Sequence, residues 1–191
     1  MRVPLISLLL LAGGMAGCAD RSSTKPIEVL DERTGVTLGA LKEPIELAPS
    51  AQSAALVSHK QVSFAYLGPI EWNRSGILSY GLWVHIVPGS DRQPGDIHAP
   101  ETLALTLDDG PLALPPGETP KLGRAPYRQL APWGQTAYFD LTVDGLKRMA
   151  ASRKLELRVR AMDGSTMTFT PTQDSRPVLT KYMQVRGITG D

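Results

Sequence analysis

Few side chains in this 191-residue chain have the type and spacing that chemistry requires. Asp108 and Asp109 are adjacent carboxylates, a pair that could bind a metal ion or serve as acid and base. They stand directly before Gly110-Pro111 and between two apolar runs, where aspartate commonly forms turns. We therefore interpret the pair as part of a turn.

The three histidines, at positions 59, 85 and 98, lack the close spacing of a metal site. His85 lies inside the most apolar run of the chain, which favours a core or interface residue over a ligand. The sequence contains no Gly-x-Ser-x-Gly, His-Glu-x-x-His or Walker-type motif. We expect no catalytic residue, no metal site and no cofactor.

The most specific pattern stands at the N-terminus. Arg2 precedes a short apolar run, Pro4 to Ala12, and Met15-Ala16-Gly17 leads to Cys18, the only cysteine of the chain. Charge, apolar run and small residues in this order are typical of a secretory signal, and the run is too short to span a membrane as a helix. A single cysteine also excludes a disulfide within the chain.

Met15-Ala16-Gly17-Cys18 resembles the lipobox of bacterial lipoproteins, with Met15 where leucine is more usual. The resemblance implies that residues 1–17 are a signal peptide and that Cys18 is lipidated, as the first residue of the mature chain. Two or more acyl chains hold a protein stably at a membrane, whereas one does not. Ala19 follows the cysteine, which by resemblance to enterobacterial sorting favours the periplasmic face of the outer membrane. Asp20 leaves the inner membrane open.

Residues 18–26 form a lipidated cysteine and short polar tether, and residues 27–191 form a single domain. The eight residues from Ala19 to Pro26 reach at most ~27 Å when extended, so the domain stays close to its membrane. The chain has 20 basic and 19 acidic side chains, and loss of Arg2 equalises them. This balance indicates neither a protein that binds nucleic acid nor one that binds an anionic membrane surface.

Glycine and proline separate many short apolar runs, a pattern typical of strands joined by turns. We expect an opening hairpin of Ile27–Asp31 and Val36–Leu47, and a half-buried strand over Gln61–Leu67. Ile77–Val87 is apolar almost throughout and predicts a central strand covered on both faces, with a bulge or close contact at Gly81. Asn73 to Gly76 is expected to form a turn.

Two hairpins can be put in register from the pattern. In the first, Leu107 pairs with Leu112 and leaves a four-residue loop, Asp108 to Pro111. In the second, a three-residue loop from Met162 to Gly164 pairs Val159 with Met167 and keeps one face apolar. The predicted core includes nine residues from these and other runs: Val62, Phe64, Leu82, Val84, Leu105, Leu141, Leu157, Val159 and Phe169.

Helix signals are limited to Asp144–Arg153 and to Val178–Val185, which follows Pro177. About nine strands and two short helices predict a mainly all-β fold: an antiparallel β-sandwich, immunoglobulin-like or similar. Aromatic residues along or beside the strands are expected to pack in the core or at sheet edges: Tyr66, Trp72, Tyr80, Trp83, Tyr127, Trp133 and Tyr138.

Two long polar connections, Pro88–Pro100 and Pro115–Pro126, are the candidate binding loops. If the strands around them alternate in direction, both lie at one end of the sandwich, opposite the Asp108–Pro111 turn. Such loops are functional in some proteins and merely mobile in others, and both readings stay open. Their charged and polar residues are Asp91, Arg92, Asp96, His98, Glu118, Lys121 and Arg124.

The segments Trp72–Gly76 and Tyr80–Trp83 are similar to those of small uncharacterised proteobacterial envelope lipoproteins, a resemblance that implies no activity. We expect a membrane-anchored module that binds or scaffolds an envelope protein. One alternative is an accessory subunit of an envelope machine, in the manner of the type VI secretion outer-membrane lipoprotein. Another is an enzyme that acts on envelope polymers. The oligomeric state is left open.

Overall fold

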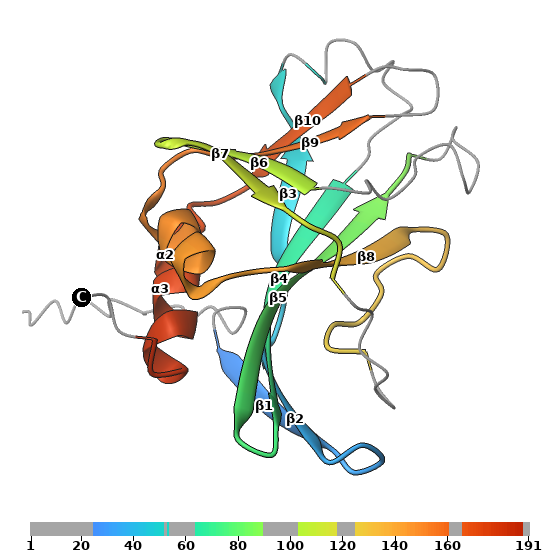
Figure 1. Cartoon of the computed structure of the whole chain (residues 1–191). Helices are drawn as coiled ribbons and strands as arrows, with labels where there is room; N and C mark the ends of the chain where they lie inside the picture. Colours follow the sequence, from blue (N-terminus) through green and yellow to red (C-terminus); the bar gives the residue numbers. More distant parts are fainter. Residues whose placement is uncertain are drawn as a thin grey trace, which may run out of the picture.

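A computed structural model describes residues 25–51, 53, 64–89, 103–117, 125–160 and 166–188. Within them the chain forms antiparallel strands and two short helices, which confirms the expected fold class (Figure 1). The strands are β1 (Pro26–Asp31), β2 (Val36–Leu41), β3 (Ile45–Pro49), β4 (Phe64–Arg74), β5 (Ile77–Val87), β6 (Leu103–Leu107), β7 (Gly110–Leu114), β8 (Gln135–Asp140), β9 (Leu155–Arg160) and β10 (Thr166–Pro171). The helices are α2 (Val143–Ala151) and α3 (Arg176–Val185).

The strand pairings form a closed circuit. One edge of β4 pairs with β5, which pairs in turn with β8. The other edge leads through β3, β10, β9 and β6 to β7. Beyond β7 the chain reaches β8, because Gly117 N donates to Tyr138 O at 2.9 Å and Asp140 N donates to Pro115 O at 3.0 Å. The sheet therefore folds over on itself and encloses its core.

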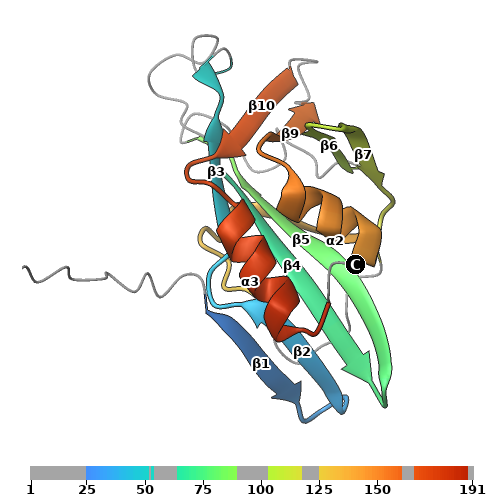
Figure 2. The ribbon, with the colours of Figure 1, turned by 90° about the vertical axis from the view of Figure 1, so that its left-hand side faces the viewer.

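A second feature, the β1–β2 hairpin, extends the sheet away from this circuit. β2 pairs with β4 over residues 70–74, whereas β3 pairs with β4 over residues 65–67. The four strands β1, β2, β4 and β5 thus continue as a ribbon that projects from the body (Figure 1). In Figure 2, α3 lies across one face of this sheet with α2 beside it.

Alternation along the strands determines which side chains face the core. Leu105 pairs with Leu112 on one side and with Leu157 on the other, and Leu157 pairs with Phe169. All four side chains are buried. Of the nine predicted core residues, seven are buried and Phe64 is half-buried, while Val62 lies outside the described residues.

The two predicted hairpin registers had different outcomes. Val159 pairs with Met167 and Leu157 with Phe169, which confirms the second register; its loop, Met162 to Gly164, lies outside the described residues. The first register was wrong by two residues, because Leu107 pairs with Gly110. Gly110, at φ +121°, is the first residue of β7, so the turn consists of two residues, Asp108 and Asp109.

Three strand predictions need correction. Residues 36–47 contain two strands rather than one, and β4 extends beyond the predicted strand to Arg74, so the turn is Ser75-Gly76 alone. β5 has the predicted bounds, but only Gly81 to Ile86 are buried. Its start is exposed because it lies in the ribbon. Gly81 pairs without a bulge and makes the expected close contact, since a Cβ there would lie 2.6 Å from the Trp72 ring.

Helix α2 begins one residue before the predicted start and ends two residues before the predicted end. Thr142 Oγ1 accepts a hydrogen bond from Gly145 N and so caps its first turn. Helix α3 begins at Arg176 because Pro177, with its fixed φ and missing N–H, suits the first turn.

Gly68 and Pro69 mark the fork where β4 changes partner. Both residues stand between the stretches that pair with β2 and β3. The ring of Tyr127 covers this point, and its hydroxyl donates to Pro69 O at 2.8 Å and accepts from Leu41 N at 3.1 Å. A Cβ on Gly68 would lie 2.2 Å from the Tyr127 ring, so only glycine fits here.

Gly68→Ala should therefore destabilise the domain by about 3 kcal/mol, at the upper end of the cost of overpacking a core. Urea unfolding of the mature protein measures the loss. Ala104→Val, which adds volume at an exposed position of β6, is the control and should stay within about 0.5 kcal/mol of wild type. Equal stabilities of all three proteins would contradict the packing at the fork.

Candidate functional site

The residues that the sequence singled out for binding lie outside the described part of the chain. This holds for Cys18 and for all seven loop residues: Asp91, Arg92, Asp96, His98, Glu118, Lys121 and Arg124. The described strand ends beside these loops, Leu103 and Leu114, pair with each other. Both connections therefore adjoin the end of the β6–β7 hairpin that lies opposite its turn.

His85 is a core residue rather than an exposed ligand. Its ring is buried and stacks on Trp83 with centroids 5.4 Å apart, and its Nδ1 lies 2.9 Å from Thr136 Oγ1. Burial lowers its pKa, because an imidazolium would lose its hydration there. His59 and His98 lie outside the described residues.

Asp108 and Asp109 form the turn that the sequence predicted, and they also attach that turn to α2. Asp109 binds the Arg148 guanidinium through both carboxylate oxygens, at 2.7 and 3.0 Å. Asp108 Oδ2 accepts from Arg153 N at 2.6 Å, and Asp108 N donates to Ser152 Oγ at 2.8 Å. Ser152 is buried and donates to Lys154 O, so one hydroxyl joins the turn to the end of the helix.

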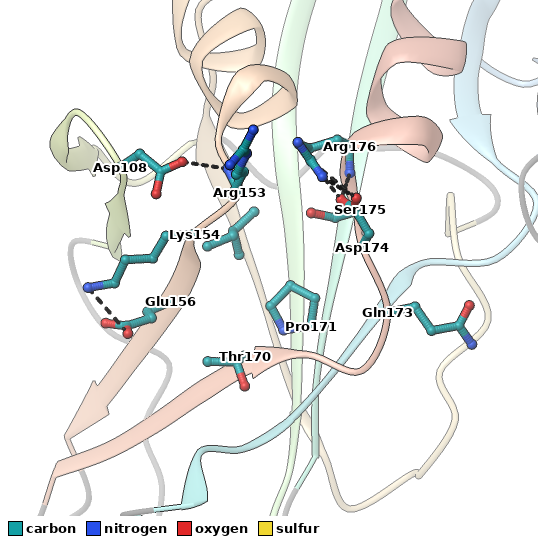
Figure 3. A pocket seen from close by; sticks show the side chains of 11 residues that line it. Asp108, Arg153, Lys154, Glu156, Thr170, Pro171, Gln173, Asp174, Ser175 and Arg176 are labelled. Carbon is teal, nitrogen blue, oxygen red and sulfur yellow. Dashed lines mark hydrogen bonds and ion pairs between the residues drawn. The ribbon is translucent and has the colours of Figure 1, made fainter.

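A charged groove of about 530 Å³ opens beside this junction. Figure 3 shows Asp108 and Arg153 on one side and Asp174 and Arg176 on the other, with Pro171 between them. Its eleven lining residues come from the β6–β7 turn, the α2–β9 connection, and the end of β10 with the start of α3: Asp108, Arg153, Lys154, Leu155, Glu156, Thr170, Pro171, Gln173, Asp174, Ser175 and Arg176.

Ion pairs set the electrostatics of the charged groove. Arg176 binds Asp174 at 2.6 Å and lowers the pKa of that carboxyl to about 2, so Asp174 stays ionised at neutral pH. Lys154 lies 3.4 Å from Glu156 across the mouth. The exposed Arg153 guanidinium forms no ion pair or side-chain hydrogen bond among the described residues, but its charge also lowers the pKa of Asp174.

This arrangement suits recognition of a polar partner. Three basic and three acidic side chains alternate around a groove whose walls are fixed by the hydrogen bonds of Ser152 and Asp174. A partner with complementary charges could replace the water around these groups without leaving a charge unpaired. Across the described ranges, no group of three or more His, Cys, Asp or Glu side chains could hold a metal ion.

Sequence reasoning missed the charged groove and also a buried ion cluster under the end of α3. Arg186 packs over Gly39, where a Cβ would lie 2.4 Å from its guanidinium carbon. It binds Glu28 at 2.9 Å, lies 3.8 Å from Glu71 and donates to Ile27 O. Burial raises the pKa of Glu71, and the Arg186 charge opposes that rise. The cluster fastens the chain after α3 to the ribbon.

A second hollow, of about 610 Å³, lies between residues 125–129 and the face of the β1–β2 hairpin that points away from Arg186. Its floor is apolar and includes Val29 and Leu38. The hollow carries two charged side chains, Lys42 and Arg128, whereas the charged groove brings six together. The charged groove is therefore the candidate site.

Comparison of the chain with protein-family models, with curated proteins and with solved structures gives no match. Neither described helix has the length and apolar character needed to cross a membrane.

Ser152→Ala should lower the free energy of unfolding by about 1–3 kcal/mol, because Asp108 N and Lys154 O both lose a buried partner. Thermal unfolding measured by circular dichroism tests this. Thr180→Ala, at an exposed position of α3, is the matched hydroxyl deletion and should leave the midpoint almost unchanged. If Ser152→Ala unfolded at the wild-type temperature, the proposed role of this hydroxyl in fixing the groove would be wrong.

Proposed function

We propose that this protein is a lipoprotein of the bacterial envelope, anchored by Cys18 to the periplasmic face of the outer membrane, whose β-domain binds or scaffolds an envelope protein. The observation that carries the proposal is the order of charge, short apolar run and Met15-Ala16-Gly17-Cys18 at the N-terminus. The short polar tether supports it, since it ends where β1 begins at Pro26.

The charged groove is the proposed contact surface for the partner. It is open, rich in paired charges and built on element ends that hydrogen bonds hold in place, features that suit a polar protein interface. Arg153 would bind a carboxylate of the partner, because among the described residues Lys154 is ion-paired with Glu156 and Arg176 with Asp174, whereas the Arg153 side chain has no such ion pair. The partner is therefore expected to present an acidic side chain within a polar surface.

The anchor can be tested by metabolic labelling with a fatty-acid analogue. Wild type should incorporate the label, and its intact mass should equal residues 18–191 plus the acyl groups. Cys18→Ala should lose both the label and the mass increment, because no thiol remains to be acylated. Ser23→Ala, in the tether, is the control and should behave as wild type. Equal labelling of Cys18→Ala would sink the lipoprotein proposal.

The contact surface can be tested with a photo-crosslinking amino acid in intact cells. Thr170, in the charged groove, should give a discrete crosslinked product, and exposed Ala113 on β7 should give none. Arg153→Glu in the Thr170 protein should weaken the crosslink several-fold while the melting temperature is preserved. A product from His98 but not from Thr170 would instead place the partner on the Pro88–Pro100 connection.

A further inference from the structure

The end of the ribbon carries a concentration of exposed apolar side chains. We define the ribbon tip as residues 30–37 and 73–78. In the register of the four strands, Leu30, Thr37, Asn73 and Leu78 form one row across one face, with the two leucines at its ends. Ile77 lies in the next row, opposite Arg74, and so on the other face of the ribbon. Leu30 is 59% exposed, Ile77 72% and Leu78 49%. Three of the six exposed large hydrophobic residues in the described part of the chain thus gather at this tip.

Helix α3 does not reach the tip. It ends at Val185, and Arg186 fastens the chain to Glu28 and Ile27, on the body side of Leu30. Figures 1 and 2 show the two hairpins of the ribbon extending beyond both helices. The apolar side chains therefore project from the body instead of closing a core.

Hydrogen bonds within the tip pair backbone N–H groups of its two turns. Thr34 N and Gly35 N both donate to Asp31 O, at 3.1 and 2.8 Å, and the Asp31 carboxylate accepts from the Thr34 hydroxyl. In the other turn, Gly76 N donates to Asn73 Oδ1 at 2.7 Å. The outer edges of β1 and of residues 77–80 pair with no described strand, so the tip can enter the hydrated headgroup boundary of a bilayer but not its hydrocarbon core.

The tip carries two arginines, Arg33 and Arg74, and two carboxylates, of which Asp31 is buried. Arg33 and Arg74 are both exposed and flank the apolar side chains, with Glu32 as the one exposed acidic residue among residues 30–37 and 73–78. Arginine can extend its charge to phosphate groups while its aliphatic stem lies along apolar surface. Apolar side chains beside arginines thus suit a bilayer interface, because the apolar side chains can contact the acyl chains while the arginines bind the headgroup phosphates.

The position of the tether brings the tip to a membrane. β1 runs from Pro26, where the tether ends, to Asp31, a distance of ~17 Å for a six-residue strand. The tether itself spans at most ~27 Å, so a domain held by Cys18 keeps the tip within reach of the bilayer surface. Lipid anchors gain strongly from a second membrane contact.

We propose that the ribbon tip inserts Leu30, Ile77 and Leu78 into the interface of the phospholipid bilayer and so fixes the orientation of the lipid-anchored domain. The proposal rests on the Cys18 anchor proposed above. It concerns a separate surface, at the opposite end of α3 from the charged groove.

The test uses the full mature lipoprotein, in which acylation of Cys18 leaves no other thiol. Ile77→Cys then supplies a single site for an environment-sensitive fluorophore. The protein is reconstituted into vesicles of phosphatidylethanolamine and phosphatidylglycerol that contain acyl chains with a quencher. We expect a blue-shifted emission and about a twofold loss of intensity at position 77, because the ~30 Å hydrocarbon core holds the quencher.

Two further label sites make the measurement specific. Ala113→Cys, exposed on β7, should show no quenching. Trp133→Cys tests the other exposed apolar site, since Trp133 is 52% exposed and neighbours exposed Leu130. Quenching at position 133 without quenching at position 77 would overturn the proposal. A label at position 77 that is shielded from water but not quenched would also overturn it, because a second protein copy rather than lipid would then cover the label. In the Ile77→Cys protein, the paired substitutions Leu30→Ser and Leu78→Ser should abolish the quenching at position 77 while the melting temperature is retained.

A mass spectrum taken first separates this proposal from the one on which it rests. If Cys18 carries no acyl chain, the lipoprotein proposal fails, and the vesicle measurement is repeated with Cys18→Ser as the background for Ile77→Cys. Quenching in that background would support the tip as a membrane contact in its own right. An acylated protein without quenching at position 77 would overturn the tip alone.

Discussion

The fork in β4 is the constraint on which the architecture depends. A strand has two edges, and β4 gives one edge entirely to β5 but divides the other between β2 and β3. Pro69, which has no N–H to donate, stands where the partners change. Tyr127 completes the fork: its hydroxyl satisfies both Leu41 N, at the end of β2, and Pro69 O. Burial raises the pKa of this phenol, so the bridging proton remains in place.

Two different surfaces follow from this division. On the β3 side the sheet continues through β10, β9, β6 and β7 back to β8, and the resulting circuit buries the core. On the β2 side the sheet remains open and becomes the ribbon, whose start is covered by α3 and whose tip is not. The contact between Tyr127 and Gly68 thus lies at the boundary between the closed circuit of strands and the ribbon that projects from the body.

Sequence reasoning succeeded where side-chain alternation decides the structure. The β9–β10 register follows from keeping Leu157, Val159, Met167 and Phe169 on one face, which a three-residue loop allows and a two-residue loop does not. The β6–β7 register could not be decided in the same way, because a shift of two residues leaves every side chain on its original face. The fork was also hidden, since Gly68-Pro69 within an apolar run indicates a break in a strand rather than a change of partner.

The charged groove was less predictable than the fold for a physical reason. Its residues come from three separate segments, 108, 153–156 and 170–176, and most are polar residues that carry no periodic signal. Sequence analysis recognised Asp108 as a turn residue, which is correct, but the same carboxylate also accepts from Arg153 N and so shapes the groove wall. A single residue can have both roles, and only the tertiary contact distinguishes them.

The two proposed surfaces are related through α3. The helix begins at Arg176 in the charged groove and ends at Val185, next to the Arg186 cluster that fastens the ribbon. Ten residues of helix separate the two ends by ~15 Å. A domain that rests on its ribbon tip therefore holds the charged groove on the side away from the bilayer, where a periplasmic partner can reach it. Contact at the tip would thus orient the groove, a constraint that a flexible tether alone cannot impose.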